Sequence, residues 1–179
     1  MKKNVIVFGL ISGLIVSAFM VVGTMWCYPN FEGSMVLGYA GMLLSFSMVF
    51  VGIKNYRDKY NGGIISLGKA LQIGLYISLV ASTCYVVAWL IEYYVFIPDF
   101  MDKYSAHMLL KAQNSGVSAA ELAVKTKEIV SMKDMYKSPI MVILFTYAEI
   151  LPIGLVVTLI SALILKRKIS NGGGAVAVS

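Results

Sequence analysis

The chain has 179 residues, of which 59% are apolar by a count that includes Ala, Tyr and Cys, and only 13% are charged. A soluble domain carries about 25% charged residues, so this composition argues against a soluble globular fold. The same numbers exclude intrinsic disorder, which requires low hydrophobicity and high charge. Two cysteines are too few for a disulfide framework or a metal cluster.

Four apolar runs are each long enough to cross a bilayer, which requires about 20 mostly apolar residues. We predict spanning helices over residues 5–26, 35–53, 70–91 and 140–165. The only charged residue in these runs is Glu149. The first run follows Lys2 and Lys3 and is longer than the apolar part of a signal peptide, which is about 7–15 residues. We therefore expect it to be an uncleaved helix rather than a removed signal.

The basic residues predict the orientation, because Lys and Arg in short loops face the cytoplasm. The short loop between the first two runs contains none. Nine basic residues gather at the N-terminus, in the loop between the second and third runs, and after the fourth run: Lys2, Lys3, Lys54, Arg57, Lys59, Lys69, Lys166, Arg167 and Lys168. We predict that both termini lie in the cytoplasm. Trp26, Tyr28, Trp89, Tyr93 and Tyr94 then fall near the outer boundary, where an aromatic belt is expected.

Residues 98–137 are the only long polar segment and predict an extracytoplasmic helical hairpin between the third and fourth spans. Asp99 can cap the first helix. Gly116 ends it, and Ser118 with Glu121 forms a capping box for the second helix, which continues to about Met135. Alternatively, the second helix continues into the fourth span. The hairpin is either a solvated connector or a docking surface for a partner or a lipid head group. We expect the single histidine, His107, to be a surface residue.

Small residues recur every four positions along each spanning run, which is typical of close helix packing in a membrane. They predict one compact domain over residues 1–168, with 169–179 as a flexible tail. The residues that we expect to pack the helices are Gly9, Gly13, Gly41, Gly74, Ser78 and Gly154.

Glu149 is a candidate intramembrane site, because ionisable residues within spanning helices are usually functional. Its depth has two readings. If the apolar core ends at Leu165, Glu149 lies about 4–5 Å below the outer boundary; if the core begins at Pro139, it lies about 15 Å deep. Pro152 removes a helical hydrogen bond three residues later. Glu92 lies at the outer end of the third run and is a candidate second carboxylate for a cation or a proton. The alternative is an interfacial glutamate beside a kink.

Two groups of motifs resemble the domain-of-unknown-function family 4199. The first group follows the second run: Tyr56-Arg57, Asn61-Gly62-Gly63, Ile65-Ser-Leu-Gly-Lys-Ala70 and Gly74. The second is Glu149-Ile-Leu-Pro152-Ile-Gly154 with Leu159-Ile-Ser-Ala-Leu-Ile-Leu165 and a basic tail. The resemblance covers residues 1–168, and Leu67 stands where an aromatic residue is expected. It implies a bacterial four-helix integral membrane protein of the cytoplasmic membrane in a Gram-negative envelope, and it implies no activity.

The leading hypothesis is a structural or interaction protein of the bacterial cytoplasmic membrane. The alternative is a small transporter or an ion or proton pathway that uses Glu149 and Glu92, although no inverted repeat relates the four runs. We do not expect an enzyme, because one histidine outside the membrane offers no nucleophile–base pair. No cofactor, metal or nucleic acid is expected. The expected partners are membrane lipids and an unidentified protein or a second copy of the chain.

Overall fold

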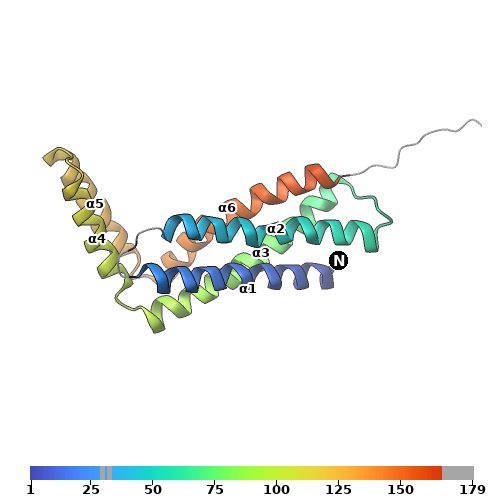
Figure 1. Ribbon diagram of the computed structural model, residues 1–179, viewed down its shortest axis with the longest axis horizontal. Coiled ribbons are helices and arrows are strands. Elements are labelled where there is room, and N and C mark those ends of the chain that lie inside the picture. Colours follow the sequence, from blue (N-terminus) through green and yellow to red (C-terminus); the bar gives the residue numbers. More distant parts are fainter. Residues whose placement is uncertain (29–30, 32–33, 167–179) are drawn as a thin grey trace, which may run out of the picture.

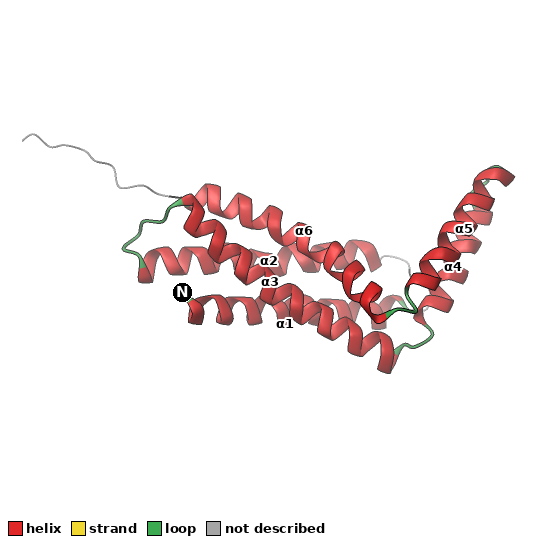
Figure 2. Ribbon diagram, turned by 180° about the vertical axis from the view of Figure 1, so that it is seen from behind, coloured by secondary structure: helices red, strands yellow, loops and turns green. Residues whose placement is uncertain are grey.

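A computed structural model of the protein describes residues 1–28, 31 and 34–166, and this part of the chain is helical without strands (Figures 1 and 2). The predicted tail, 169–179, lies outside the described residues. Six α-helices and one π-helix follow in order: α1 (Lys2–Cys27), α2 (Ser34–Tyr60), α3 (Leu67–Ile91), η1 (Glu92–Phe96), α4 (Phe100–Asn114), α5 (Ala119–Met135) and α6 (Pro139–Leu165).

Four of these helices, α1, α2, α3 and α6, lie side by side along the long axis of the molecule (Figure 1). Helix α1 contacts α2 and α3, and α6 contacts the same two helices from the other side. Helices α4 and α5 contact each other and project from one end of this assembly. The N-terminus, the α2–α3 loop and the C-terminal end of α6 lie together at the opposite end.

Three helical segments are long and apolar enough to cross a membrane: Lys2–Trp26, Leu67–Phe96 and Pro139–Leu165. They contain the predicted spans 5–26, 70–91 and 140–165. The predicted span 35–53 lies within α2, which is not among these three in the part of the chain that the structure describes. Helix α3 continues beyond its predicted end, because the π-helical turn of η1 extends it to Phe96.

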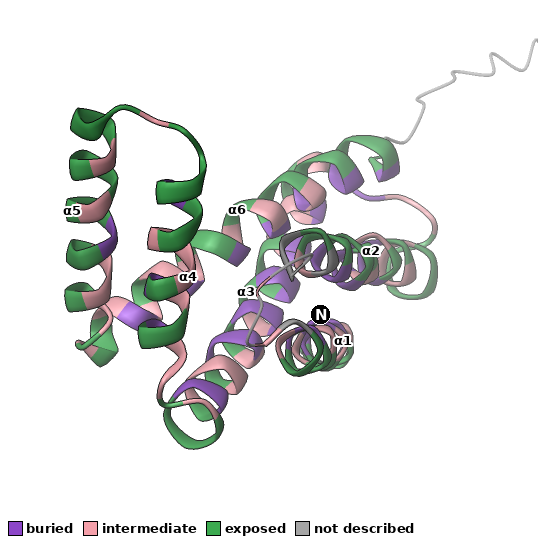
Figure 3. Ribbon diagram, turned by 60° about the vertical axis from the view of Figure 1, so that its left-hand side comes forward, coloured by how far each residue is buried: buried purple, intermediate pink, exposed green. Residues whose placement is uncertain are grey.

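The helices bury one face each against their neighbours and leave large apolar side chains on the opposite face (Figure 3). Phe46 and Ile53 of α2 are fully buried with Ile77 of α3 at the centre. In contrast, Leu14 of α1 is 69% exposed and Ile140 of α6 is 68% exposed. An apolar surface of this kind is stable in lipid and unfavourable in water, because burial from water is what drives apolar side chains inward.

Several buried polar side chains pair across the helix contacts. The hydroxyls of Ser12 in α1 and Ser45 in α2 lie 2.8 Å apart, and each also donates to the backbone carbonyl of the other residue. The Ser78 hydroxyl lies 3.1 Å from that of Thr158 and donates to the carbonyl of Gly154. These bonds satisfy groups that would be costly to bury alone.

Several of the small residues predicted to pack the helices lie where another helix approaches closely. A Cβ atom added to any of five glycines would lie less than 3 Å from a side-chain carbon of another helix. The distances are 2.7 Å from Gly9 to Val80, 2.6 Å from Gly13 to Cys84, 2.7 Å from Gly41 to Phe19, 2.6 Å from Gly74 to Thr158 and 2.9 Å from Gly154 to Phe46. A side chain at any of these positions would overlap its neighbour. Gly52, which was not among the predicted packing residues, also lies at a close contact. A Cβ added there would lie 2.5 Å from the Cδ1 of Ile77.

Helices α4 and α5 form two separate elements, and α5 ends before α6 begins. The capping box of Ser118 and Glu121 is confirmed, since each side chain bonds to the other residue's backbone N–H. Gly116 ends α4 with a φ of 68°. Asp99 occupies the N-cap position of α4, but its side chain makes no cap hydrogen bond. The capping prediction is therefore wrong for Asp99, because its carboxylate bonds to Tyr28 and Lys103 instead.

Candidate functional site

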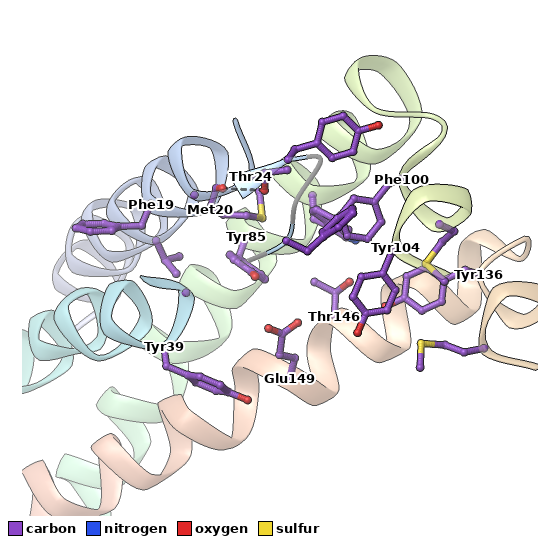
Figure 4. A pocket seen from close by; sticks show the side chains of 18 residues that line it. Phe19, Met20, Thr24, Tyr39, Tyr85, Phe100, Tyr104, Tyr136, Thr146 and Glu149 are labelled. Atoms are coloured by element: carbon purple, nitrogen blue, oxygen red, sulfur yellow. Dashed lines mark hydrogen bonds between the residues drawn. The ribbon is translucent and has the colours of Figure 1, made fainter. Parts of the chain in front are cut away.

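A cavity of about 350 Å³ lies where the four packed helices meet α4 and α5 (Figure 4). All six α-helices contribute to its wall, and Phe31 contributes from the segment between α1 and α2. It therefore exists only because segments far apart in the sequence converge at this end of the molecule.

Nine of the 18 residues that line the cavity are aromatic: Phe19, Tyr28, Phe31, Tyr39, Tyr85, Trp89, Phe100, Tyr104 and Tyr136. Their rings contact one another at several points. The ring centroids of Trp89 and Phe100 lie 5.0 Å apart in an edge-to-face arrangement, and those of Phe100 and Tyr104 lie 5.8 Å apart in a stack. Such contacts add to the stability of a cluster beyond the area it buries.

Among the described residues that line this cavity, Glu149 is the only charged one, and its side chain is exposed rather than buried. In Figure 4 its carboxylate points into the cavity from α6, between Tyr39 and Thr146. No residue in the described part of the chain forms an ion pair or a hydrogen bond with it. The structure thus places the predicted intramembrane carboxylate in a cavity of which half the described lining residues are aromatic and none is basic.

Pro152 lies inside α6, one turn after Glu149. Its ring leaves the carbonyl of Ala148 without the usual helical partner. The residue itself is exposed and does not line the cavity. Gly154, two residues further along α6, is buried against Phe46 of α2. Pro152 and Gly154 therefore lie on different faces of the helix.

Glu92 is buried, with 5% of its surface exposed, and it does not line the cavity. Its Oε2 atom has no hydrogen-bond partner among the residues that the structure describes. Tyr85, which lines the cavity, interacts electrostatically with both Glu92 and Glu149. The structure does not bring the two carboxylates together in one cavity.

The rim of the cavity is held by a polar contact between the end of α1 and the start of α4. The Tyr28 hydroxyl donates to Oδ1 of Asp99 at 2.5 Å, and the Lys103 ammonium lies 2.8 Å from Oδ2 of the same carboxylate. Lys103 also lies 4.5 Å from the centre of the Tyr28 ring. The hydrogen bonds from Lys103 and Tyr28 lower the pKa of the Asp99 carboxyl, so it is ionised at neutral pH.

The tyrosine on the α5–α6 connection remains neutral over the physiological range. Burial raises the pKa of the Tyr136 hydroxyl to about 12, and the Glu149 carboxylate is the next largest cause. Tyr136 therefore remains a hydroxyl rather than a phenolate and adds no charge to the wall.

Most of the cavity residues were missed by reasoning from the sequence. Trp89 and Tyr93 were expected near the outer boundary of the membrane; in the structure Trp89 lines the cavity and Tyr93 is buried beside Phe100. Trp26, at the end of α1, does face outward and is 84% exposed. The available signal was a concentration of aromatic residues at the ends of α1 and α3 and at the start of α4. His107, expected on the surface, lies with its ring 5.6 Å from that of Phe31.

A protein-family model matches most of this chain. The family model described as "Protein of unknown function (DUF4199)" matches residues 7–167, nearly the whole chain. The chain belongs to the DUF4199 family. No curated protein matches the chain, and no solved structure does so either.

The resemblance stated from the sequence motifs is therefore confirmed. Both motif groups, from Tyr56 to Gly74 and from Glu149 to Leu165, fall within the matched residues. Membership in DUF4199 brings no activity with it. The function must be inferred from the cavity and from the helices that surround it.

Proposed function

We propose that this DUF4199 protein is a multi-pass integral membrane protein that acts as a structural or interaction protein, and that its binding site is the cavity at the junction of the six helices. The observation that carries the proposal is the cavity itself, with one unpaired carboxylate and nine aromatic residues in its wall. A protein that only joined helices would not require a cavity of this size at their junction. Binding pockets commonly measure about 300–1,000 Å³ and are mostly apolar with a few polar groups.

We propose α2 as a fourth spanning helix beside the three that meet the length and hydropathy criteria. It has 27 residues, which gives a length of about 40 Å at about 1.5 Å per residue. It packs between α1 and α6 and exposes large apolar side chains such as Leu43 and Leu44. Because this outer face is as apolar as those of its neighbours, we expect it to contact lipid as they do.

The proposed orientation has both termini in the cytoplasm and α4 and α5 outside it, in a bacterial cytoplasmic membrane. Basic residues at the N-terminus, in the α2–α3 loop and at Lys166 support this orientation, since they gather at one end of the molecule (Figure 1). Helices α4 and α5 lie at the opposite end. The proposed partners are membrane lipids and a protein or a second copy of the chain, without nucleic acid.

A transport or proton pathway through Glu149 and Glu92 is the weaker proposal. It requires polar groups that can serve a passing ion, whereas the buried hydroxyls of Ser12, Ser45, Ser78 and Thr158 are bonded across helix contacts. Only Glu149 of the two carboxylates lines the cavity. We also propose that the protein is not an enzyme and requires no cofactor, on the ground of its residue types.

Cysteine accessibility tests this proposal in the native membrane. In a background in which both native cysteines are replaced by alanine, a cysteine at Gln113 in α4 should react with a membrane-impermeant maleimide in intact spheroplasts. A cysteine at Asn61, in the α2–α3 loop, should react only after the membrane is permeabilised. Both positions are exposed in the structure, so accessibility reports the side of the membrane. The reverse labelling pattern would contradict the orientation, and labelling of both sites from outside would contradict a single span by α3.

A further inference from the structure

We propose that the cavity binds an organic cation, either a quaternary ammonium or a hydrophobic amine. The Glu149 carboxylate supplies the opposite charge, and the aromatic residues around it form the cage. This inference rests on the proposed function, because it names the ligand class of the cavity on which that proposal depends.

The charge of the cavity wall is the first argument. Glu149 is the only charged residue among the described residues of this wall, and no described lysine or arginine forms an ion pair with it. Lys103, at the rim, is already bonded to Asp99 and covers the Tyr28 ring. The Glu149 side chain is exposed, so a cation that enters the cavity can lie directly beside the carboxylate. The ligand must therefore bring the positive charge that the chain does not supply.

The aromatic residues are the second argument. The face of an aromatic ring attracts a cation within about 6 Å of its centre, and aromatic cages are the usual means of binding quaternary ammonium groups. Tyr39 and Tyr85 flank Glu149 in Figure 4, and Tyr104 and Tyr136 face it from the other side. Several aromatic rings around one carboxylate can bind a bulky cation. The positive charge of such a cation is spread over its alkyl groups, so that each ring can contact part of it.

An inorganic cation fits this cavity less well than an organic one. Calcium requires about six to eight oxygen ligands, and magnesium requires an octahedral set. Within the described residues, no group of three or more His, Cys, Asp or Glu side chains is close enough to hold a metal ion. A volume of about 350 Å³ also leaves room for carbon substituents on the nitrogen.

The experiment uses the full-length protein in dodecyl maltoside, a neutral detergent, and reads binding from tryptophan fluorescence. The chain has two tryptophans, and only Trp89 lines the cavity. Trp26→Phe therefore leaves a single reporter at the site. We expect choline and tetraethylammonium to change the Trp89 emission in a saturable manner. The neutral isostere of choline, 3,3-dimethylbutan-1-ol, should change it far less.

A second arm identifies the source of the cation. Dodecyltrimethylammonium at a small mole fraction in the micelles is compared with the uncharged dodecanol. Saturation by choline or tetraethylammonium supports a soluble ligand. Saturation by dodecyltrimethylammonium alone supports the head group of an amphiphile in the membrane. Both results support the same cation chemistry in the cavity.

Glu149→Gln tests the role of the carboxylate and keeps its shape. We expect the affinity for the cation to fall by about tenfold or more, as for the loss of one opposite charge close to the bound cation. Glu92→Gln is the matched control, since Glu92 does not line the cavity, and it should leave the affinity unchanged. Tyr104→Leu tests the cage independently and should also weaken binding. Thermal unfolding of each variant in detergent shows whether it is folded.

Three results would overturn the proposal: no saturable response to any cation, equal binding of the neutral isostere, or unchanged affinity in folded Glu149→Gln protein. Binding in detergent does not depend on the orientation in the membrane. Failure of cation binding with the expected labelling of Gln113 and Asn61 would therefore remove this inference alone. Cation binding together with reversed labelling would contradict the proposed topology instead.

Discussion

At the scale of single residues, glycines determine how closely the helices approach. Gly74 of α3 faces Thr158 of α6, and a Cβ at Gly74 would lie 2.6 Å from the Cγ2 of that threonine. Thr158 has little freedom to move, because its hydroxyl lies at hydrogen-bond distance from Ser78 and β-branched side chains are restricted at χ1. In lipid no hydrophobic force pulls helices together, so this close contact contributes directly to their association.

We expect Gly74→Leu to lower the free energy of unfolding in detergent by about 1–3 kcal/mol or more, the usual cost of overpacking. The matched control is Gly68→Leu in the same helix, where a Cβ meets no atom within 4 Å. That variant should be neutral or slightly stabilising, because leucine forms helix better than glycine. Thermal unfolding followed by circular dichroism measures both. Equal stability of the two variants would show that the face of α3 containing Gly74 is not a packing surface.

At the scale of elements, the start of α4 is joined to the end of α1 by a polar contact between residues far apart in the sequence, and is not stabilised by a side-chain helix cap. Asp99 accepts from Tyr28 at the end of α1 and pairs with Lys103 one turn into α4. These partners lower the pKa of Asp99 in the folded protein below its ordinary value of 3.8. A carboxyl with a lowered folded-state pKa stabilises the fold above its unfolded pKa and loses that contribution as the pH falls through the folded value.

We therefore expect wild-type protein to be more stable than Asp99→Asn at about pH 6, and this difference to disappear towards about pH 3. Asparagine keeps the shape and can still accept from Tyr28, so the comparison isolates the charge. The contribution is small, because the contact is solvent-exposed. Thermal unfolding of both proteins across this pH range provides the measurement. A difference that does not change with pH would mean that the charge of Asp99 does not hold α4 in place.

At the scale of the whole molecule, two regions are held by different interactions. The four packed helices are joined by apolar contacts and by neutral hydrogen bonds such as that between Ser12 and Ser45. Of the four ion pairs between described residues, three lie in or beside α4 and α5, and one of these links the two helices: Lys133 to Asp102, at 2.6 Å. The two regions should therefore respond differently to ionic strength.

We expect salt to loosen α4 and α5 selectively. Raising the ionic strength from about 0.1 M to about 1 M shortens the Debye length from about 10 Å to about 3 Å and screens exposed ion pairs. Amide hydrogen exchange in detergent should become faster in α4 and α5 and remain unchanged in α1 and α3. Lys133→Met should reduce the salt response. A uniform response along the chain would contradict this division.

The sequence by itself determined where the helices lie along the chain, the family and the apolar character of the chain. Three of the predicted spans correspond to helices that meet the criteria for crossing a membrane, and the capping box of Ser118 and Glu121 marked the start of α5. These features are local. A helix depends on a continuous run of suitable residues, and a cap depends on residues three positions apart.

Only the tertiary structure decided what surrounds Glu149. The sequence singled out this carboxylate and suggested Glu92 as its companion, but the folded chain separates the two and places aromatic residues of several helices around Glu149 alone. In the folded chain Asp99 also accepts a hydrogen bond from Tyr28 instead of capping α4, the role predicted from the sequence. The physical reason is that a cavity and a long-range contact depend on the angles and the rotation at which helices pack. Those follow from many small contacts, such as Gly74 against Thr158, that no single segment of the sequence specifies.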